Sequence, residues 1–116
     1  MLFICYSKCS TCKNAQAWLE EKGKKFETRD IKDKNPSKAE LKEWYEKSGL
    51  DIKRFFNTSG LLYKEMRLKD KLKDMSLDEK LKLLSTDGML VKRPLVVAKD
   101  KVLLGFKEDE WQTLIP

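Results

Sequence analysis

The stretch YSKCSTCKNAQAWL, residues 6–19, contains the transition from a strand to a helix that decides the fold. The run LFICY, residues 2–6, is apolar and rich in β-forming side chains, which predicts a buried strand. An amphipathic helical pattern follows over residues 13–22, and Gly23 predicts its end. Residues 24–31 resemble a second strand, so the chain is expected to open as β-α-β.

Residues 32–88 are predicted to be almost entirely helical. Two helix starts in this region have the pattern of a capping box, Ser37 with Glu40 and Ser76 with Glu79. In such a box the serine hydroxyl and the glutamate carboxylate each accept a hydrogen bond from the backbone at the other position. The sequence therefore predicts helices that begin just after each serine.

Glycines indicate where these helices end, and leucines indicate the apolar face of one of them. Gly49 is expected to end the first of the two capped helices, and Gly88 to close the region. In the second capped helix, Leu77, Leu81 and Leu84 fall on one face, which is the pattern of an amphipathic helix.

The last part of the chain changes character. Residues 95–98 and 101–104 read as two strands joined by a tight turn at Lys99 and Asp100. The segment KEDEWQTLI, residues 107–115, predicts a final amphipathic helix with its apolar side chains inward. The predicted order is thus β-α-β, a helical insertion, then β-β-α.

The length of 116 residues favours one domain, an α/β core of residues 1–31 and 89–116 with residues 32–88 inserted. Hydrophobic residues make up 41% of the chain, which argues against a disordered protein. No apolar run is long enough to cross a bilayer, and the start lacks the basic flank of a signal peptide. We therefore expect a cytoplasmic protein without membrane contact, and nothing in the sequence indicates an obligate oligomer.

The formal net charge is +6, from 25 basic and 19 acidic residues. Acidic and basic residues alternate along most of the chain, which favours a solvated exterior over a nucleic-acid site. Direct DNA binding is not expected, because no base-reading motif is present. The chain has no histidine, which excludes chemistry that depends on imidazole.

The three cysteines, Cys5, Cys9 and Cys12, leave three interpretations open. A structural zinc site needs four ligands, and neither a second cysteine pair nor a histidine is available. Packing suits Cys5, which lies in the apolar run. Cys9 and Cys12 lie instead among polar residues in a turn, and such a C-x-x-C beside a β-α-β pattern indicates a redox pair.

The redox interpretation has a physical mechanism. A helix that begins near residue 10 or 11 directs unpaired N–H groups and its positive dipole end toward Cys9. With positive charge from Lys8 and Lys13, these groups are expected to lower the pKa of the Cys9 thiol. Cys12 lies one turn along the helix and can displace whatever Cys9 has bound. Cys9 is therefore the predicted nucleophile and Cys12 the resolving thiol, with a redox disulfide between them.

The dipeptide Arg93-Pro94 precedes the predicted strand LVV. From the residues alone Pro94 reads as a turn proline at the start of an edge strand, and its isomer cannot be deduced. Arg93 is either a surface ion-pair residue or a group that orients an anion.

The segments CSTCKNAQAWLEEKG, VKRPLVV and LLGFKEDEW together resemble the ArsC/Spx family of thioredoxin-like proteins over essentially the full length. The resemblance implies a thioredoxin-like fold with an inserted helical subdomain and a cis Pro94 against Cys9. It implies no metal and no bound cofactor. Reducing equivalents would come from thioredoxin, glutaredoxin or a low-molecular-weight thiol.

Two activities occur in that family. Arsenate reductases use one loop cysteine, matched by Cys9, and oxyanion-binding arginines, of which Arg93 matches one. Ser59 and Lys107 occupy the places where further arginines would be sought, and neither offers the planar fork of a guanidinium. The expected function is therefore a thiol-disulfide oxidoreductase rather than an enzyme dedicated to arsenate.

Spx-like members are transcription regulators that bind the C-terminal domain of the RNA polymerase alpha subunit and use C-x-x-C as a redox switch. Gly49 either matches a glycine at that contact or simply ends a helix. This alternative function would use as its candidate contact a basic surface of exposed residues, namely Lys64, Arg67, Lys69, Lys71 and Lys73.

Overall fold

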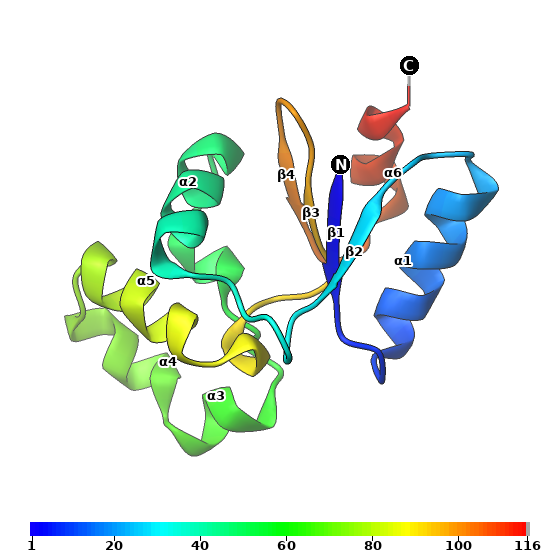
Figure 1. Cartoon of the computed structure of the whole chain (residues 1–116). Helices are drawn as coiled ribbons and strands as arrows, with labels where there is room; N and C mark the ends of the chain where they lie inside the picture. Colours follow the sequence, from blue (N-terminus) through cyan, green and yellow to red (C-terminus); the bar gives the residue numbers. More distant parts are fainter. Residues whose placement is uncertain (116) are drawn as a thin grey trace.

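The computed structural model describes residues 1–115 and, within them, one mixed four-stranded sheet between two layers of helices (Figure 1). The strands are β1 (Leu2–Cys5), β2 (Glu27–Asp30), β3 (Leu95–Val97) and β4 (Val102–Leu104). Their order is β2-β1-β3-β4, with β1 parallel to β2 and antiparallel to β3. Because parallel strands need a crossover, helix α1 (Ser10–Glu21) connects β1 to β2. The predicted α/β order, with β3 and β4 as an antiparallel hairpin, is confirmed.

One face of the sheet packs on α1 and on α6 (Glu108–Trp111), which continues as a 3-10 turn to Leu114 (Figure 1). Side chains alternate across a strand, so Phe3 of β1 joins this layer while Ile4 faces the other one. The Phe3 ring meets the fully buried Trp111 edge-on, with 6.3 Å between ring centroids. The C-terminal helix is thus fixed by an aromatic contact with the centre of the sheet.

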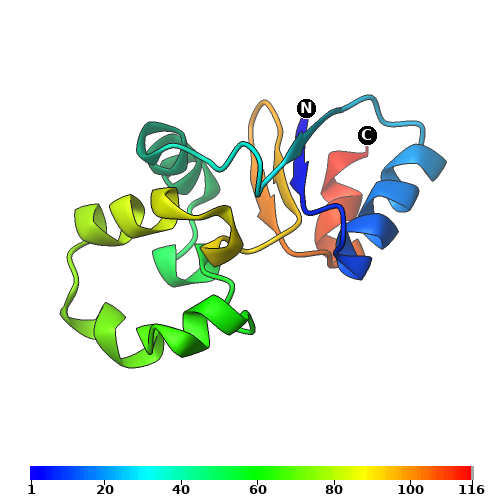
Figure 2. The ribbon, with the colours of Figure 1, turned by 60° about the horizontal axis from the view of Figure 1, so that its bottom comes forward.

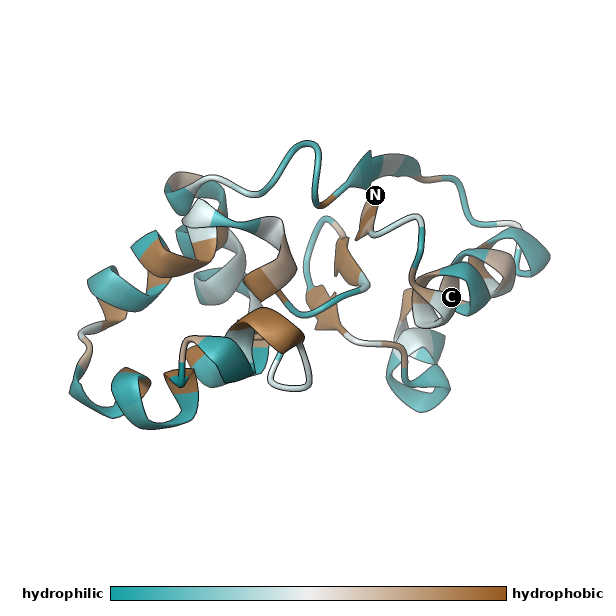
Figure 3. Ribbon diagram, turned by 90° about the horizontal axis from the view of Figure 1, so that it is seen from below, coloured by the Kyte–Doolittle hydropathy of each residue, from teal (hydrophilic) through white to brown (hydrophobic). Residues whose placement is uncertain are grey.

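The other face is covered by the helical layer, residues 38–90, which follows β2 and precedes β3 (Figure 2). Its elements are α2 (Lys38–Ser48), η1 (Ile52–Phe55), α3 (Leu61–Glu65), α4 (Leu68–Lys71), η2 (Leu72–Asp74), α5 (Leu77–Thr86) and η3 (Gly88–Leu90). Figure 3 shows strands β3 and β4 mostly brown and the helices teal along much of their outer sides. The apolar sides of these helices form one continuous core with the sheet.

Both predicted capping boxes are present. The Ser37 hydroxyl accepts a hydrogen bond from the Glu40 backbone, and the Ser76 hydroxyl accepts one from Glu79, each at 3.1 Å. Gly49 ends α2 in the left-handed conformation, with φ of 68°, which agrees with its interpretation as a helix stop.

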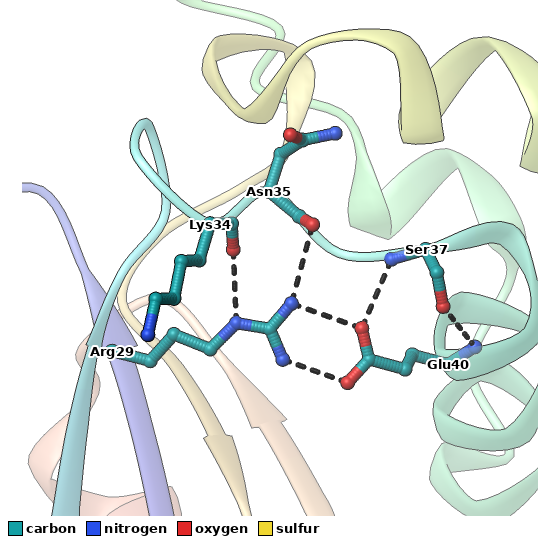
Figure 4. A network of polar contacts seen from close by, with 5 residues as sticks. All are labelled: Arg29, Lys34, Asn35, Ser37 and Glu40. Atoms are coloured by element: carbon teal, nitrogen blue, oxygen red, sulfur yellow. Dashed lines mark hydrogen bonds and ion pairs between the residues drawn. The ribbon is translucent and has the colours of Figure 1, made fainter.

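A polar network fastens the start of the helical layer to strand β2 (Figure 4). The Arg29 guanidinium donates to both carboxylate oxygens of Glu40, at 2.7 and 2.9 Å, and to the carbonyls of Lys34 and Asn35. The same carboxylate accepts from the Ser37 backbone N–H at 3.0 Å. One carboxylate therefore caps α2 and anchors it to the sheet.

Three details add to the predictions or differ from them. Leu81 and Leu84 are buried, whereas Leu77, the first residue of α5, is 42% exposed. The second strand is shorter than residues 24–31, because β1 offers only four residues for pairing. Gly88 begins η3, and a side chain there would collide with the carbonyl of Ile31.

Among residues 1–115, no helix combines the length and the apolar character that a bilayer crossing requires.

Candidate active site

Cys9 lies where β1 turns into α1. It is the N-cap residue of the helix, with extended backbone angles of −94° and 120°, and its carbonyl accepts a hydrogen bond from Lys13 at 3.1 Å. Its own N–H donates to the carbonyl of Tyr6 at 3.0 Å, which fixes the turn. The helix begins at Ser10, as predicted, so Cys9 lies at the end of the helix where the first N–H groups have no partner within the helix.

The environment of Cys9 favours the thiolate. Partial burial, the largest single effect, raises the pKa of its thiol, but the opposing effects together outweigh it and the pKa is lowered overall. The opposing groups are the backbone N–H and the thiol of Cys12 and the guanidinium of Arg93, which acts through hydrogen bonding and charge. No capping hydrogen bond of the usual geometry forms, so the interaction with the Cys12 N–H is looser than a serine cap.

The cation that lowers the pKa of Cys9 is not one of those predicted. Lys8 and Lys13 are exposed, and neither is among the main groups that shift the pKa of Cys9. The nearby cation is Arg93, which the fold brings from a distant part of the chain. The helix start acts as expected, but the charge comes from the loop before β3.

Cys12 has the opposite character. Its side chain is 1% exposed, and its sulfur accepts a hydrogen bond from the backbone N–H of Tyr6 at 3.4 Å. Burial is the main cause that raises the pKa of Cys12 to about 12, and the neighbouring sulfurs of Cys9 and Cys5 add to it. The pair thus consists of an accessible acidic thiol and a sheltered, weakly acidic one.

Arg93 and Pro94 form the opposite wall. The peptide bond between them is cis, as the resemblance implied, and Pro94 is buried. The guanidinium carbon of Arg93 lies 5.2 Å from the centre of the Tyr6 ring, an arrangement that favours a cation–π interaction. The Nε and Nη1 atoms of Arg93 are buried without a hydrogen-bond partner among residues 1–115. Buried donors without a partner are unusual in native proteins, so these two atoms suit an anionic ligand.

A cavity of about 490 Å³ opens beside Cys9, within the range of small-molecule sites. Thr11 and Ser59 contribute hydroxyl groups to its wall. Among residues 1–115, four cationic side chains line it and no carboxylate does: Arg54, Lys92, Arg93 and Lys107. The cavity is therefore suited to an anion that lies next to a nucleophilic sulfur.

The sequence prediction had missed Arg54, a residue of η1. Backbone bonds hold η1 against the loop before β3: the Lys92 N–H donates to the Phe55 carbonyl, and the Asn57 N–H donates to that of Leu90, both at 2.8 Å. These bonds bring Arg54 and Arg93 to one cavity. Only this long-range pairing marks Arg54, and no local motif does.

Cys5, Cys9 and Cys12 are all free thiols. Within residues 1–115, no three cysteine or acidic side chains are arranged as metal ligands would be.

Comparison with known proteins identifies the family and agrees with the fold. Residues 5–114 match the ArsC family, and the chain belongs to that family. The YusI protein of Bacillus subtilis is 55% identical over 112 residues, which span 97% of this chain and 95% of YusI.

Solved structures show the same architecture. A Bacteroides fragilis protein described as related to the ArsC family superimposes with a TM-score of 0.95 at 51% identity, over 97% of this chain and 95% of the other. A possible arsenate reductase of Streptococcus mutans gives 0.86 at 45% identity, over 94% and 95%. The thioredoxin-like α/β fold of this family is thereby established for the chain.

Regulators are more distant relatives. The regulatory protein MgsR of Bacillus subtilis is 26% identical over 95% of this chain and 86% of its own length. The global transcriptional regulator Spx of Streptococcus agalactiae is 24% identical over 93% and 77%.

Proposed function

We propose that the protein is a thiol-disulfide oxidoreductase in which Cys9 is the nucleophile and Cys12 the resolving thiol. The observation that carries this proposal is the contrast between the two thiols, because the pKa of Cys9 is lowered while that of Cys12 is raised to about 12. Of the two sulfurs, the accessible one is then the one that forms a thiolate more readily. The thiolate is the reactive form, and a helix N-terminus is a setting that activates it.

The reaction has two exchange steps. The Cys9 thiolate attacks one sulfur of an acceptor disulfide, a Cys9–acceptor bond forms, and the other acceptor sulfur leaves with the electron pair and takes up a proton. Cys12 then loses its proton and attacks the Cys9 sulfur, which forms the Cys9–Cys12 disulfide and releases the second half of the acceptor as a thiolate. Thioredoxin, glutaredoxin or a small thiol would restore both cysteines by the reverse exchange.

The cavity indicates an acceptor that carries negative charge. Cationic residues line the cavity beside Cys9, and one of them, Arg93, has two buried donors without a partner among residues 1–115. A carboxylate of a small thiol, or an oxyanion, would satisfy those donors and offset the local positive charge. Arg93 is therefore assigned the role of orienting the anion and stabilising the Cys9 thiolate.

The test is reduction of a small anionic mixed disulfide, such as one between cysteine and a dicarboxylate thiol, with thioredoxin and its reductase as the electron source. The wild type should turn over. Cys9→Ser should lose turnover, and Cys12→Ser should accumulate a mixed disulfide at Cys9 that mass spectrometry detects. Full activity in both variants would refute the proposal. A parallel assay with arsenate asks whether an oxyanion is also accepted.

A redox-switched regulator is the second candidate, favoured by the similarity to MgsR and Spx. The five basic residues of its candidate contact surface are exposed on and between α3, α4 and η2. In this alternative the Cys9–Cys12 bond changes affinity for the C-terminal domain of the RNA polymerase alpha subunit. A pull-down with that domain, using reduced and oxidised protein, separates the two candidates, and absence of binding in both states would exclude the regulator.

A further inference from the structure

The third cysteine has no part in the proposed reaction, yet it lies beside the resolving thiol. Cys5 is the last residue of β1, and Cys12 lies in the first turn of α1. The N–H that donates to the Cys12 sulfur, at 3.4 Å, belongs to Tyr6, which follows Cys5 directly. Cys5 packs into the layer formed by α1 and α6, the side on which Cys12 is buried.

The side chains also interact. Burial is the main cause that raises the pKa of the Cys5 thiol, and the neighbouring Cys12 side chain acts in the opposite direction. Both neighbouring sulfurs also affect Cys12, because those of Cys9 and Cys5 each contribute to its raised pKa. Cys12 therefore lies between two thiols, an acidic one on the cavity side and a weakly acidic one on the sheet side.

From this juxtaposition we infer that Cys5 is a second partner of Cys12 and that the disulfide moves inward by internal exchange. The Cys5 thiol gives its proton to solvent, and its thiolate attacks the Cys12 sulfur of the Cys9–Cys12 bond. A Cys5–Cys12 bond forms, the Cys9–Cys12 bond breaks, and Cys9 leaves with the electron pair as a thiolate. No electrons enter or leave the protein, so no further reactant is required.

Thiol acidity favours this direction. The thiol with the lower pKa is the better leaving group, and among the three this is Cys9. The product keeps the disulfide on Cys12, which is 1% exposed, and on the half-buried Cys5, where an external reductant has less access. It also restores the thiolate at the cavity while the resolving thiol is occupied. A group then captured by Cys9 stays bound, so the exchange converts a catalytic site into a trapping one.

The inference rests on the proposed redox function. Tryptic peptide mapping tests the two separately, because it distinguishes a Cys9–Cys12 bond from a Cys5–Cys12 bond. Cleavage after Lys8 and Lys13 leaves Cys5 in peptide 1–8 and both other cysteines in peptide 9–13. A Cys9–Cys12 bond therefore stays within one peptide, whereas a Cys5–Cys12 bond joins two. The experiment oxidises the full chain with diamide, blocks free thiols with N-ethylmaleimide and maps the peptides by mass spectrometry.

We expect wild-type protein to yield the joined peptides with the maleimide on Cys9. Cys9→Ser should yield the same pair as its main oxidised species, and Cys5→Ala should keep only the bond within peptide 9–13. Circular dichroism confirms that each variant is folded. If wild type forms only the internal bond and Cys9→Ser remains fully reduced, the exchange is refuted and the proposed function stands. If no disulfide forms in any of the proteins, both fail.

Discussion

Helices α1 and α5 both begin after an N-cap residue with an extended backbone, but the two helix starts have different roles. At α5, the Ser76 hydroxyl accepts a hydrogen bond from the Glu79 N–H at 3.1 Å, and the Glu79 carboxylate accepts one from the Ser76 N–H at 3.0 Å. These backbone donors are therefore satisfied by side chains of the helix start itself. At α1 the N-cap is Cys9, the third helical residue is Cys12, and the first turn contains no acidic residue. The N–H groups of α1 therefore remain available to a negative sulfur.

This difference separates stability from reactivity. A capping serine and glutamate stabilise their helix by satisfying its donors. A cysteine in the same place gives up that stabilisation and gains acidity, because the donors favour its thiolate over its thiol. Exchanging or removing the groups that make the two helix starts unlike should therefore change either stability or reactivity.

The largest effect is expected from Cys9→Ser, which converts the start of α1 into one like that of α5. Loss of the only accessible acidic thiol should lower turnover by more than about a thousandfold, as removal of a nucleophile does in other enzymes. The free energy of unfolding should stay the same or rise by up to about 1 kcal/mol, because serine is a preferred N-cap. Steady-state kinetics and urea denaturation measure the two quantities. A marked loss of stability would contradict this account of α1.

Arg93→Met should have the next largest effect. It removes the guanidinium that lowers the pKa of Cys9 by hydrogen bonding and charge. The pKa of Cys9 should rise, and alkylation by iodoacetamide at pH 7 should slow by about tenfold for each unit of the rise. Arg67→Met, at an exposed arginine between α3 and α4, is the matched control and should alkylate like wild type. Equal rates in both variants would show that Arg93 does not stabilise the thiolate.

Ser37→Ala and Ser76→Ala remove the side-chain caps of α2 and α5, which have no counterpart at α1. Each should lower the free energy of unfolding by about 1 kcal/mol, the usual loss for a serine N-cap. Neither should change the alkylation rate of Cys9, because the two serines cap α2 and α5 and neither lines the cavity. A changed rate with unchanged stability would reverse the roles assigned to these helix starts.

The smallest effect concerns Glu40, which both caps α2 and pairs with Arg29. The Arg29 guanidinium is the main cause that lowers the pKa of Glu40 from 4.5 to about 2. A lowered pKa in the folded state means that the pair stabilises the protein fully above pH 4.5 and that this contribution disappears as pH falls through about 2. Because the carboxylate is partly exposed, we expect about 1 kcal/mol or less. Glu40→Gln should show a flatter stability profile in that window, and parallel profiles would contradict the assignment.

Local patterns were enough to predict much of the fold and part of the site. Capping boxes and Gly49 are short-range signals, because the bonds they describe join residues within one helical turn. The C-x-x-C was found for the same reason. Arg54 was missed because it reaches the cavity through the pairing of Phe56 with Val91, far apart in sequence. The position of Cys5 beside Cys12 depends likewise on how the end of β1 meets α1.

The titration of Cys9 in the wild-type protein tests the central claim most directly. The alkylation rate by iodoacetamide is followed from pH 5 to pH 10, and mass spectrometry assigns the label within peptide 9–13. The account predicts that Cys9 reacts with a midpoint below the usual cysteine pKa of about 8.5, while Cys12 stays unlabelled over the whole range. A midpoint for Cys9 at or above that value, or labelling of Cys12 before Cys9, would contradict it.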